Sequence, residues 1–319
     1  MSRGNNGRTA THRLVADSVD TYSKALPGFT LDVVRTGVGV GPNLALATVT
    51  DDVMLASCVT GFPILGRTTV ANDRVVVGLL TSTPPGSRGC EIDLEPGMML
   101  LYGPGTEHSA VDPAGLGYIA LSVTVDHLAA AAEAAELVLP DPRRGQVEVM
   151  RPTNRTVHLA RVLGSVGDPR TDENHARLLD RGDAVHALVK ALSEIPLVRD
   201  SGDRPGSTNS RRIANACIEH VDMVGGMPSI AQLCRVAHVS ERRLRKAFVD
   251  TFGVPPSQFF RLRSLNKVRT KLTTERSGLT VGATALDAGF GNLGRFAGEY
   301  SRVFGELPSE TLRRAQESL

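Results

Sequence analysis

Short apolar runs alternate with turn-forming residues over the first part of the chain, from residue 29 to residue 125. Three of the runs are LALATV (44–49), VVVGLL (75–80) and YIALSVTV (118–125). β-Branched and apolar residues favour strands, and the intervening TPPGSRG, EPG, GPGTE and DPAGLG segments supply the Gly and Pro of tight turns. Many short strands joined by tight turns predict an antiparallel barrel or a double-sheet roll.

Helical spacing replaces this pattern after residue 125. The segment 126–139 is rich in Ala, and the segments 155–166 and 175–195 carry apolar residues in rough helical spacing. Their apolar stripes fit either packing on the barrel or a contact between two subunits. The segment 199–210, RDSGDRPGSTNS, is polar and rich in Gly, Pro and Ser. It has no apolar period, which predicts a linker between two domains.

The last third of the chain contains an internal repeat. One set of residues is Leu244, Phe248, Phe252, Gly253, Pro256 and Ser257. The matching set, 52 positions later, is Phe296, Tyr300, Phe304, Gly305, Pro308 and Ser309. Upstream, Ser229-Ile230 matches Thr280-Val281 with an offset of 51, so the second turn has one inserted residue. The repeat predicts two helix-turn-helix units, each followed by a Gly–Pro connection and a further helix.

The first copy has the signals of two capped helices. Ser229 is placed as an N-cap with Gln232 at the capping-box position, and Ser240 is placed to cap the second helix. At 100° per residue, the apolar side of that helix consists of Leu244, Ala247, Phe248 and Thr251. Its opposite side carries Arg242, Arg245, Lys246 and Val249. Because Glu241 is the only acid between 240 and 249, this face predicts a polyanionic partner rather than a merely solvated surface.

The second copy differs on its outward face. Gly289 is placed for a left-handed turn, Asn292 begins the next helix, and Phe296, Tyr300, Val303 and Phe304 form its apolar side. The outward side is Gly294, Arg295, Gly298, Ser301 and Arg302. Interior glycines cost about 1 kcal/mol each relative to Ala. Either they are tolerated, or they allow close approach of DNA.

Charge separates the two parts of the chain. The 319 residues have a net charge of +2, but residues 211–319 hold 17 Lys and Arg against 10 Asp and Glu. Residues 229–276 alone hold 11 against 3, and residues 277–319 hold 4 against 5. This distribution predicts electrostatic anchoring on a nucleic acid by the first copy, and binding by shape and a few polar contacts by the second.

Several classes of protein are disfavoured by composition. The sequence contains no run of 18 or more apolar residues, so no membrane span is predicted. Residues 1–20 lack the apolar core of a secretory signal. The four cysteines, Cys58, Cys90, Cys217 and Cys234, lack CxxC spacing, which favours reduced thiols in a cytoplasmic protein. No cofactor is expected.

Residues 211–315 closely resemble the double helix-turn-helix domain of AraC/XylS-type transcriptional regulators. Two segments carry the resemblance, SIAQLCRVAHVSERRLRKAFVDTFGVPPSQFFRLRSLNKVRTKL and TVGATALDAGFGNLGRFAGEYSRVFGELPSETLRR. The second is the more diagnostic, with ALDAGF, the Phe296/Tyr300/Phe304 spacing and Pro308-Ser309. The N-terminal half resembles the cupin-like effector-binding and dimerisation part of the same family more loosely.

The resemblance implies two recognition helices in successive major grooves, about 34 Å apart on one DNA face. The DNA-binding residues it implies are Ser240, Arg242, Arg243, Arg245, Lys246, Asn292, Arg295 and Arg302. The family often has a long polar or basic side chain where Gly298 stands, so base reading by the second helix rests mainly on Arg295 and Asn292. The implied partners are promoter DNA, RNA polymerase, an unidentified small-molecule effector and a second copy of the chain. Activation is the usual role in this family.

The resulting fold class is α+β, with an N-terminal cupin-like antiparallel β-barrel and a C-terminal all-α double helix-turn-helix domain. The expected divisions are a tail (1–28), an effector-binding barrel (29–139), a helical dimerisation segment (140–198), a linker (199–210) and a DNA-binding domain (211–319).

Four alternatives test this interpretation. A metal-dependent cupin enzyme needs an HxH pair, whereas the turn segment GPGTEHSA offers Glu107 and His108 but no HxH. A Ser/His/Asp hydrolase needs a GxSxG elbow, which is absent, and a DNA-repair alkyl transferase needs clustered cysteines. We therefore expect no enzyme. A regulator whose N-terminal domain only dimerises or binds a protein remains compatible with the sequence.

Overall fold

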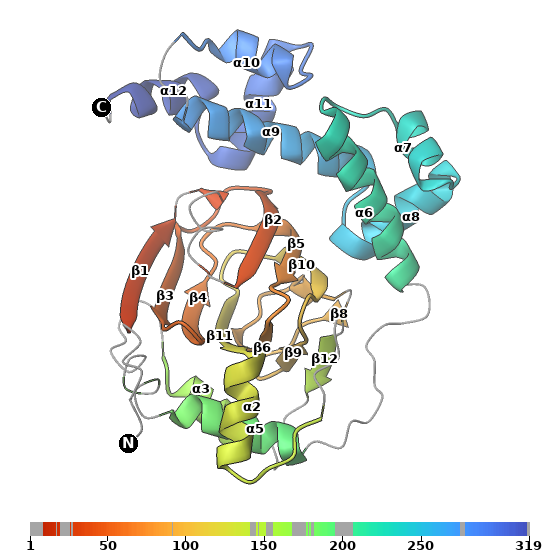
Figure 1. The fold of residues 1–319 in the computed structure, drawn as a ribbon. Coiled ribbons are helices and arrows are strands. Elements are labelled where there is room, and N and C mark those ends of the chain that lie inside the picture. The colour runs from red at the N-terminus through yellow and green to blue at the C-terminus, as the bar shows by residue number, and fades with distance from the viewer. Residues whose placement is uncertain are drawn as a thin grey trace.

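Two antiparallel sheets lie between a helical layer at one end and a helical domain at the other (Figure 1). The computed structural model describes residues 9–16, 18–19, 26, 28–90, 92–140, 145, 147–150, 156–167, 177, 179, 182–194, 207–274 and 278–317.

The larger sheet has seven strands. In spatial order they are β1 (Ala10–Ala16), β3 (Asn43–Val49), β4 (Val53–Val59), β11 (Gly117–Thr124), β6 (Arg74–Ser82), β9 (Met99–Tyr102) and β12 (Val147–Met150). All neighbouring strands are antiparallel. In the central pair, Ala120 of β11 lies opposite Gly78 of β6.

The smaller sheet has five strands and faces the first. Its order is β2 (Phe29–Arg35), β5 (Ile64–Val70), β10 (Glu107–Asp112), β7 (Arg88–Gly89) and β8 (Ile92–Asp93). Among the described strands the two sheets are separate hydrogen-bonded units. The predicted N-terminal barrel is therefore a two-sheet arrangement that does not close, while its antiparallel character is confirmed.

The central strands of the larger sheet are buried on both faces. In β6, Val75 and Val77 pack toward the helices, whereas Val76 packs between the sheets beside Leu100. A strand covered on both sides needs apolar residues at successive positions. This is why β6 is encoded by VVVGLL rather than by a simple alternation.

Among the described residues, three helices cover the outer face of the larger sheet: α2 (Val125–Ala134), α3 (Val157–Gly164) and α5 (Asp183–Glu194). Their buried residues Leu128, Leu159 and Leu188 share one apolar cluster with Leu121 of β11. The apolar stripes predicted from sequence thus pack on the sheet, the first of the two alternatives. Dimerisation by this segment remains a prediction.

Three expected boundaries are corrected by the structure. The expected tail (1–28) contains β1, which the sequence hides because an edge strand exposes most of its side chains. The expected helical segment (140–198) contains the four-residue strand β12, which extends the larger sheet beyond β9. The last four residues of the expected linker (199–210) belong to α6. The sequence hides this start of the helix because residues 207–210 are polar and precede its apolar stripe.

The C-terminal domain consists of helices in the order that the repeat predicts. They are α6 (Ser207–Val224), α7 (Ile230–Ala237), α8 (Glu241–Phe252), α9 (Pro256–Thr274), α10 (Val281–Asp287), α11 (Leu293–Phe304) and α12 (Pro308–Glu317). Helices α7–α8 and α10–α11 are the two copies, and α9 connects them (Figure 1).

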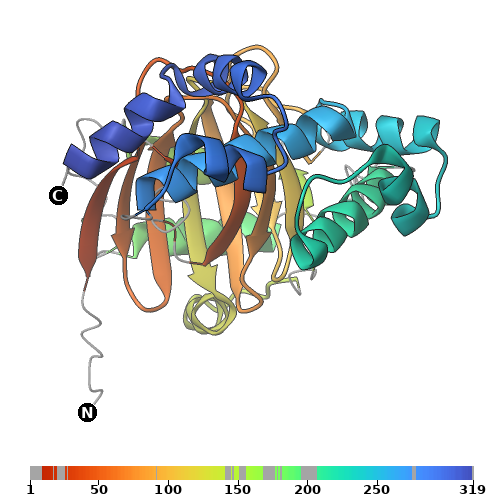
Figure 2. The ribbon, with the colours of Figure 1, turned by 90° about the horizontal axis from the view of Figure 1, so that it is seen from above.

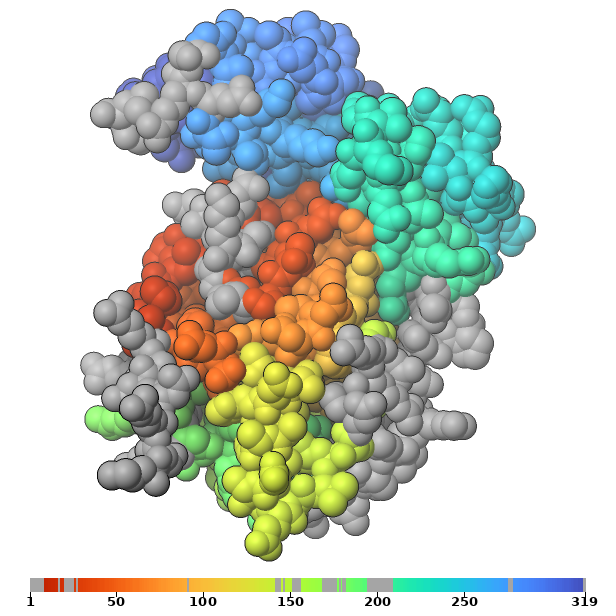
Figure 3. All heavy atoms as spheres, viewed as in Figure 1, coloured from red at the N-terminus to blue at the C-terminus, as the bar shows by residue number. Residues whose placement is uncertain are grey.

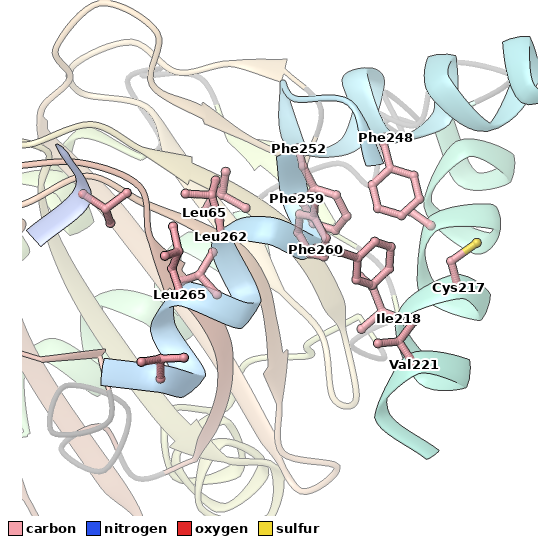
Figure 4. Packing of buried hydrophobic residues seen from close by; sticks show 14 of the residues in the cluster. Leu65, Cys217, Ile218, Val221, Phe248, Phe252, Phe259, Phe260, Leu262 and Leu265 are labelled. Carbon is pink, nitrogen blue, oxygen red and sulfur yellow. The ribbon is translucent and has the colours of Figure 1, made fainter. Parts of the chain in front are cut away.

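Aromatic side chains form the core of the first copy. Phe248 packs within 5.6 Å of Phe259 and Phe260, measured between ring centroids, and Phe252 stacks on Phe259 at 4.4 Å. Figure 4 shows these rings gathered beside Cys217 of α6. The leucine and aromatic positions of the repeat are therefore core positions, which accounts for their equal spacing in the two copies.

The C-terminal domain docks on the smaller sheet, and the views from the side and from above agree on this (Figures 2 and 3). Val34 of β2 and Leu65 of β5 belong to the same apolar cluster as Leu262 and Leu265 of α9. Asn266 of α9 accepts a hydrogen bond from the Arg35 backbone N–H (3.0 Å) and donates one to the Arg35 carbonyl (2.9 Å). We call this contact the dock.

Phe248→Ala should lower the free energy of unfolding by about 3–5 kcal/mol, because it leaves a cavity among packed aromatic rings. Val249→Ala is the matched control, since the neighbouring Val249 is 40 % exposed and should cost under about 1 kcal/mol. Urea unfolding of both variants measures the difference. Equal losses would contradict the assignment of Phe248 to the core.

Candidate nucleic-acid interface and internal cavity

Local hydrogen bonds define the first helix-turn-helix. The Ser229 hydroxyl accepts from the Gln232 backbone N–H, and the Gln232 side chain accepts from the Ser229 backbone N–H, so the predicted capping box is confirmed. Helix α7 ends at His238, which adopts a left-handed conformation with φ 52°. The Ser240 hydroxyl then accepts from the Arg243 N–H at 3.3 Å, as expected of an N-cap. The turn is thus fixed by its own polar groups.

Helix α8 separates its apolar and cationic sides as its periodicity predicts. Leu244, Ala247 and Phe248 are fully buried. Arg242, Arg245 and Lys246 are exposed, and Arg243 is half-buried. Lys246 forms an i,i+4 ion pair with Asp250 at 2.8 Å. Asp250 lies one residue beyond the segment 240–249, in which Glu241 is the only acid. A surface pair of this kind contributes at most about 1 kcal/mol, so it competes weakly with a phosphate.

The second helix-turn-helix is also fixed by capping. Gly289 has φ 90°, as predicted, and a Cβ there would lie 3.1 Å from Met227. The Asn292 side chain accepts from the Arg295 N–H at 2.9 Å and caps α11. Tyr300 is fully buried and donates to Thr311 at 2.9 Å. The buried side of α11 therefore faces α12, and the opposite side is open.

Acidic partners restrain the cations of this second copy. Glu299 accepts from Arg295 at 2.9 Å and also pairs with Arg261 of α9. Burial alone would raise the pKa of Glu299, but hydrogen bonds and charge from Arg261 and Arg295 outweigh it and lower that pKa. Arg295 nevertheless has a side chain 72 % exposed, and Arg302 is exposed.

A groove runs between the two copies. It measures about 540 Å³, counted as space open to the centre of a water molecule. Its lining includes Ser257, Gln258, Arg261, Arg295 and Arg302. Two of the predicted DNA-binding residues, Arg295 and Arg302, thus meet at one groove, whereas Arg242 and Arg245 lie on α8 in the other copy.

All three arginines of α9 have acidic protein partners. Arg263 bridges Asp222 at 2.9 Å and Asp32 at 3.2 Å, and Arg269 pairs with Glu306 at 2.6 Å. The two lysines, Lys267 and Lys271, are exposed. The arginines form these ion pairs because α9 lies between the smaller sheet and the second copy. The sequence does not reveal this position of the helix.

Protein packing does not require the outward glycines of α11. A Cβ at Gly298 would meet nothing within 4 Å, and one at Gly294 would only approach the Asn292 side chain at 3.6 Å. Both positions are exposed. Close approach of DNA therefore remains a prediction for them.

A cavity of about 100 Å³, in the same measure, lies between the two sheets. Most of its lining is apolar, including Phe29, Leu31, Val33, Leu80, Leu94 and Leu100. The polar groups that reach it include Thr68, Tyr102, His108 and Asp112. Because one ordered water needs only about 10–15 Å³ in this measure, the cavity can hold a small organic molecule.

Two titratable groups in this cavity have strongly shifted pKa values. Burial, with a smaller contribution from the nearby Arg211 charge, lowers the pKa of His108 to about 4. Burial raises the pKa of Asp112 to about 7. The Tyr102 ring lies 4.5 Å from the His108 ring, and burial raises the pKa of its hydroxyl well above the ordinary value. At neutral pH His108 is therefore uncharged.

The smaller sheet separates this cavity from the dock. Along β10, His108, Ala110 and Asp112 line the cavity, whereas Glu107 pairs with Asn215 of α6 and Val111 packs on the C-terminal core. The same alternation places other residues of the sheet on the two sides. Phe29, Leu31, Val33, Ile64 and Thr68 face the cavity, and Asp32, Val34 and Leu65 face the helices.

Sequence reasoning found only part of this second site. The sequence drew attention to Glu107 and His108 only as poor candidates for a metal site, and it identified no effector-binding residue. A period-2 reading of EHSAVD would have placed His108 and Asp112 on one face, although it could not say what that face meets.

Among the described residues, no three His, Cys, Asp or Glu side chains are grouped so that they could hold a metal ion. Across the same part of the chain, every helix is too short or too polar to cross a membrane.

Comparison with known proteins places the C-terminal domain. A family model described as a helix-turn-helix domain matches residues 233–314. The "XylDLEGF operon transcriptional activator 2" of Pseudomonas putida is 38 % identical over 104 residues, covering 31 % of this chain and 66 % of that protein. "XylDLEGF operon transcriptional activator 1" of the same organism is 40 % identical over 87 residues. That match covers 27 % of this chain and 26 % of the relative, so this chain spans about a quarter of that protein.

A solved structure resembles the chain more widely. The AraC-like transcriptional activator CuxR has a TM-score of 0.36 and 16 % identity, covering 83 % of this chain and 96 % of that one. The two capped helix-turn-helix units joined by α9 define a helix-turn-helix protein of the double-motif class. The chain belongs to the AraC/XylS-type family of transcriptional regulators.

Asp112→Asn should stabilise the protein more at pH 8 than at pH 5. Between pH values of about 4 and 7 the folded protein keeps the Asp112 proton that the unfolded chain releases. Asp112 therefore lowers the free energy of unfolding by an amount that grows with pH up to about 7 and is constant above it. Because one pKa unit corresponds to ~1.4 kcal/mol and about two units separate pH 5 from the plateau, the difference between the two pH values should be about 2–3 kcal/mol.

Urea unfolding at both pH values measures this difference. Asp126→Asn is the control, because Asp126 is an exposed acid at the start of α2. A stabilisation by Asp112→Asn that is the same at both pH values would show that Asp112 is not buried at the cavity.

Proposed function

We propose that the chain is a sequence-specific DNA-binding transcriptional regulator controlled by a small-molecule effector bound between its two sheets. The observation that supports DNA binding best is α8, with its apolar side fully buried and Arg242, Arg245 and Lys246 exposed together. Cations in this arrangement suit phosphates and guanine edges. The chain acts as an activator, as its relatives' names suggest, in the cytoplasm and in contact with RNA polymerase.

The two helix-turn-helix copies have different roles in binding DNA. Ser240, Arg242, Arg243, Arg245 and Lys246 of the first copy anchor and read one major groove. Asn292, Arg295 and Arg302 contact the next groove, where Glu299 holds Arg295 back and the exposed glycines leave room for the DNA backbone. We therefore assign most of the sequence reading to α8.

The cavity between the sheets is the effector site in this proposal. Its apolar lining with a few polar groups is typical of small-molecule pockets. The cavity favours a small effector over an N-terminal domain that only binds a protein. The helices α2, α3 and α5 supply the proposed dimer contact through faces that the sheet does not cover.

Coupling between effector and DNA follows from the shared sheet. A ligand that shifts β2 or β10 on the cavity side also shifts Asp32, Val34 or Glu107 on the dock side, because alternate residues of one strand move together. These residues contact α6 and α9, which carry the two helix-turn-helix units. The ligand then changes DNA affinity by favouring one position of the dock.

Arg242→Ala or Arg245→Ala should weaken binding to the preferred DNA site by about 1–3 kcal/mol, or roughly 5- to 150-fold, and relax one base position. The site is obtained by selecting from random duplexes with the full chain, and affinity is measured on that site and on single-base variants. Arg13→Ala, which removes an exposed cation of β1, is the charge-matched control and should leave DNA affinity unchanged. Equal losses on every sequence would identify phosphate contacts instead of base reading.

Asn266→Ala should loosen the dock, because it removes both hydrogen bonds to the Arg35 backbone. With each bond contributing about 0.5–1.5 kcal/mol, amide hydrogen exchange at Arg35 should accelerate roughly 5- to 100-fold. Lys267→Ala, the exposed neighbour on α9, is the control. Unchanged exchange at Arg35 in the Asn266 variant would mean that the sheet and the C-terminal domain are not coupled through this contact in solution.

A further inference from the structure

The cavity between the sheets contains a buried polar atom without a partner. His108 is only 9 % exposed, lines the cavity, and its Nδ1 atom has no hydrogen-bond partner among the described residues. An unsatisfied buried polar group costs about 1–3 kcal/mol. A ligand that pairs with Nδ1 would remove this cost, so the atom marks a place for one hydrogen-bonding group.

The charge of the lining is also informative. Among the described residues that line the cavity, none is Lys or Arg, and the single acid is Asp112. Arg211 of α6, whose charge acts on His108, lies beyond β10, where its Nη1 donates to the Glu107 carbonyl at 3.4 Å. Among the described lining residues, the cavity therefore has no cation that could neutralise a bound anion.

The geometry along β10 separates the two polar groups. His108 and Asp112 lie four residues apart on one strand face, about 13 Å at 3.3 Å per residue, with the small Ala110 between them. Tyr102 packs on the His108 ring. The space over Ala110 is bordered by apolar side chains such as Leu100 and Leu116. An apolar body fits there, with its polar group directed at His108.

We propose that the cavity selects an uncharged small molecule, an apolar body with one hydrogen-bonding group such as an amide, alcohol or phenol, which pairs with His108 Nδ1. It rejects carboxylate anions, because a buried carboxylate without a cation loses its hydration and here would also face Asp112. This inference rests on the proposed function of the cavity as the effector site.

The state of the two titratable groups supports this selectivity. Burial holds the pKa of His108 near 4, so at neutral pH the imidazole offers a neutral hydrogen-bonding nitrogen rather than a charge for a carboxylate. Burial holds the pKa of Asp112 near 7, so this group is neutral or negative and offers no positive charge to an anion. Arg211, the other charge close to His108, is engaged with β10 from the outer side.

The test uses the full-length chain and matched small probes at up to about 10 mM. Butyl, cyclohexyl and phenyl bodies are each offered as the primary amide, the alcohol, the amine and the carboxylate. Binding is measured by thermal shift and by calorimetry. At least one amide or alcohol should bind, and its carboxylate counterpart should bind at least ten-fold more weakly.

Two variants assign the selectivity to residues. His108→Phe keeps an aromatic ring beside Tyr102 but removes the nitrogen, and should weaken the neutral probes about ten-fold or more. Asp112→Asn keeps the shape and removes the charge, and should leave neutral probes within about two-fold while raising carboxylate affinity. His127→Phe is the control, because His127 lies on α2 with its side chain 42 % exposed.

The outcomes are separable. Tightest binding by a carboxylate or an amine, or no binding by any neutral probe, would overturn the inference. Binding of neutral probes that leaves DNA affinity unchanged would retain the ligand class but remove the proposed regulatory function. A carboxylate that binds most tightly in the cavity and changes DNA affinity would overturn the proposed ligand class but retain the proposed regulatory function.

Discussion

The smaller sheet, β2–β5–β10 with its short neighbours, is covered on both faces, and the organisation of the molecule depends on this. One face closes the internal cavity with Leu31, Val33 and Ile64, while the other buries Val34 and Leu65 against the C-terminal domain. A two-stranded or one-sided sheet could not join the two domains in this way. The fixed alternation of side chains along a strand makes the cavity wall and the dock parts of one element.

The C-terminal domain is held on this sheet by complementary polar contacts around an apolar centre. Asn266 satisfies both backbone groups of Arg35, and Arg263 joins Asp32 of the sheet to Asp222 of α6. Arg263 is 11 % exposed, so it depends on both acids to compensate its loss of hydration. These contacts leave the cationic side of α8 free.

The two helix-turn-helix copies show how one architecture can take unequal roles. Both have a polar N-cap on the second helix, an aromatic core and a left-handed glycine at its end. They differ in the outward side chains, where α8 has cations with one acidic partner and α11 has glycines and an arginine held by Glu299. The difference lies in surface charge, because core and caps are constrained by packing while the outward positions are not.

Features that depend on near neighbours along the chain can be predicted from the sequence. The capping box at Ser229, the apolar side of α8 and the left-handed Gly289 follow from local hydrogen bonds, helical period and backbone sterics, so they could be predicted. The antiparallel strands followed from their turns. The edge strand β1 and the start of α6 were missed because their local patterns are weak.

Which faces of the strands and helices pack against each other depends on contacts between segments that are distant in sequence. Asp112 and His108 become cavity residues, and Arg263 becomes part of the dock, because strands and helices distant in sequence pack around them. Burial then shifts the pKa values of the first two, which no local pattern encodes. Local propensities fix elements, whereas desolvation and pairing between elements create the site, and these exist only once the chain has folded.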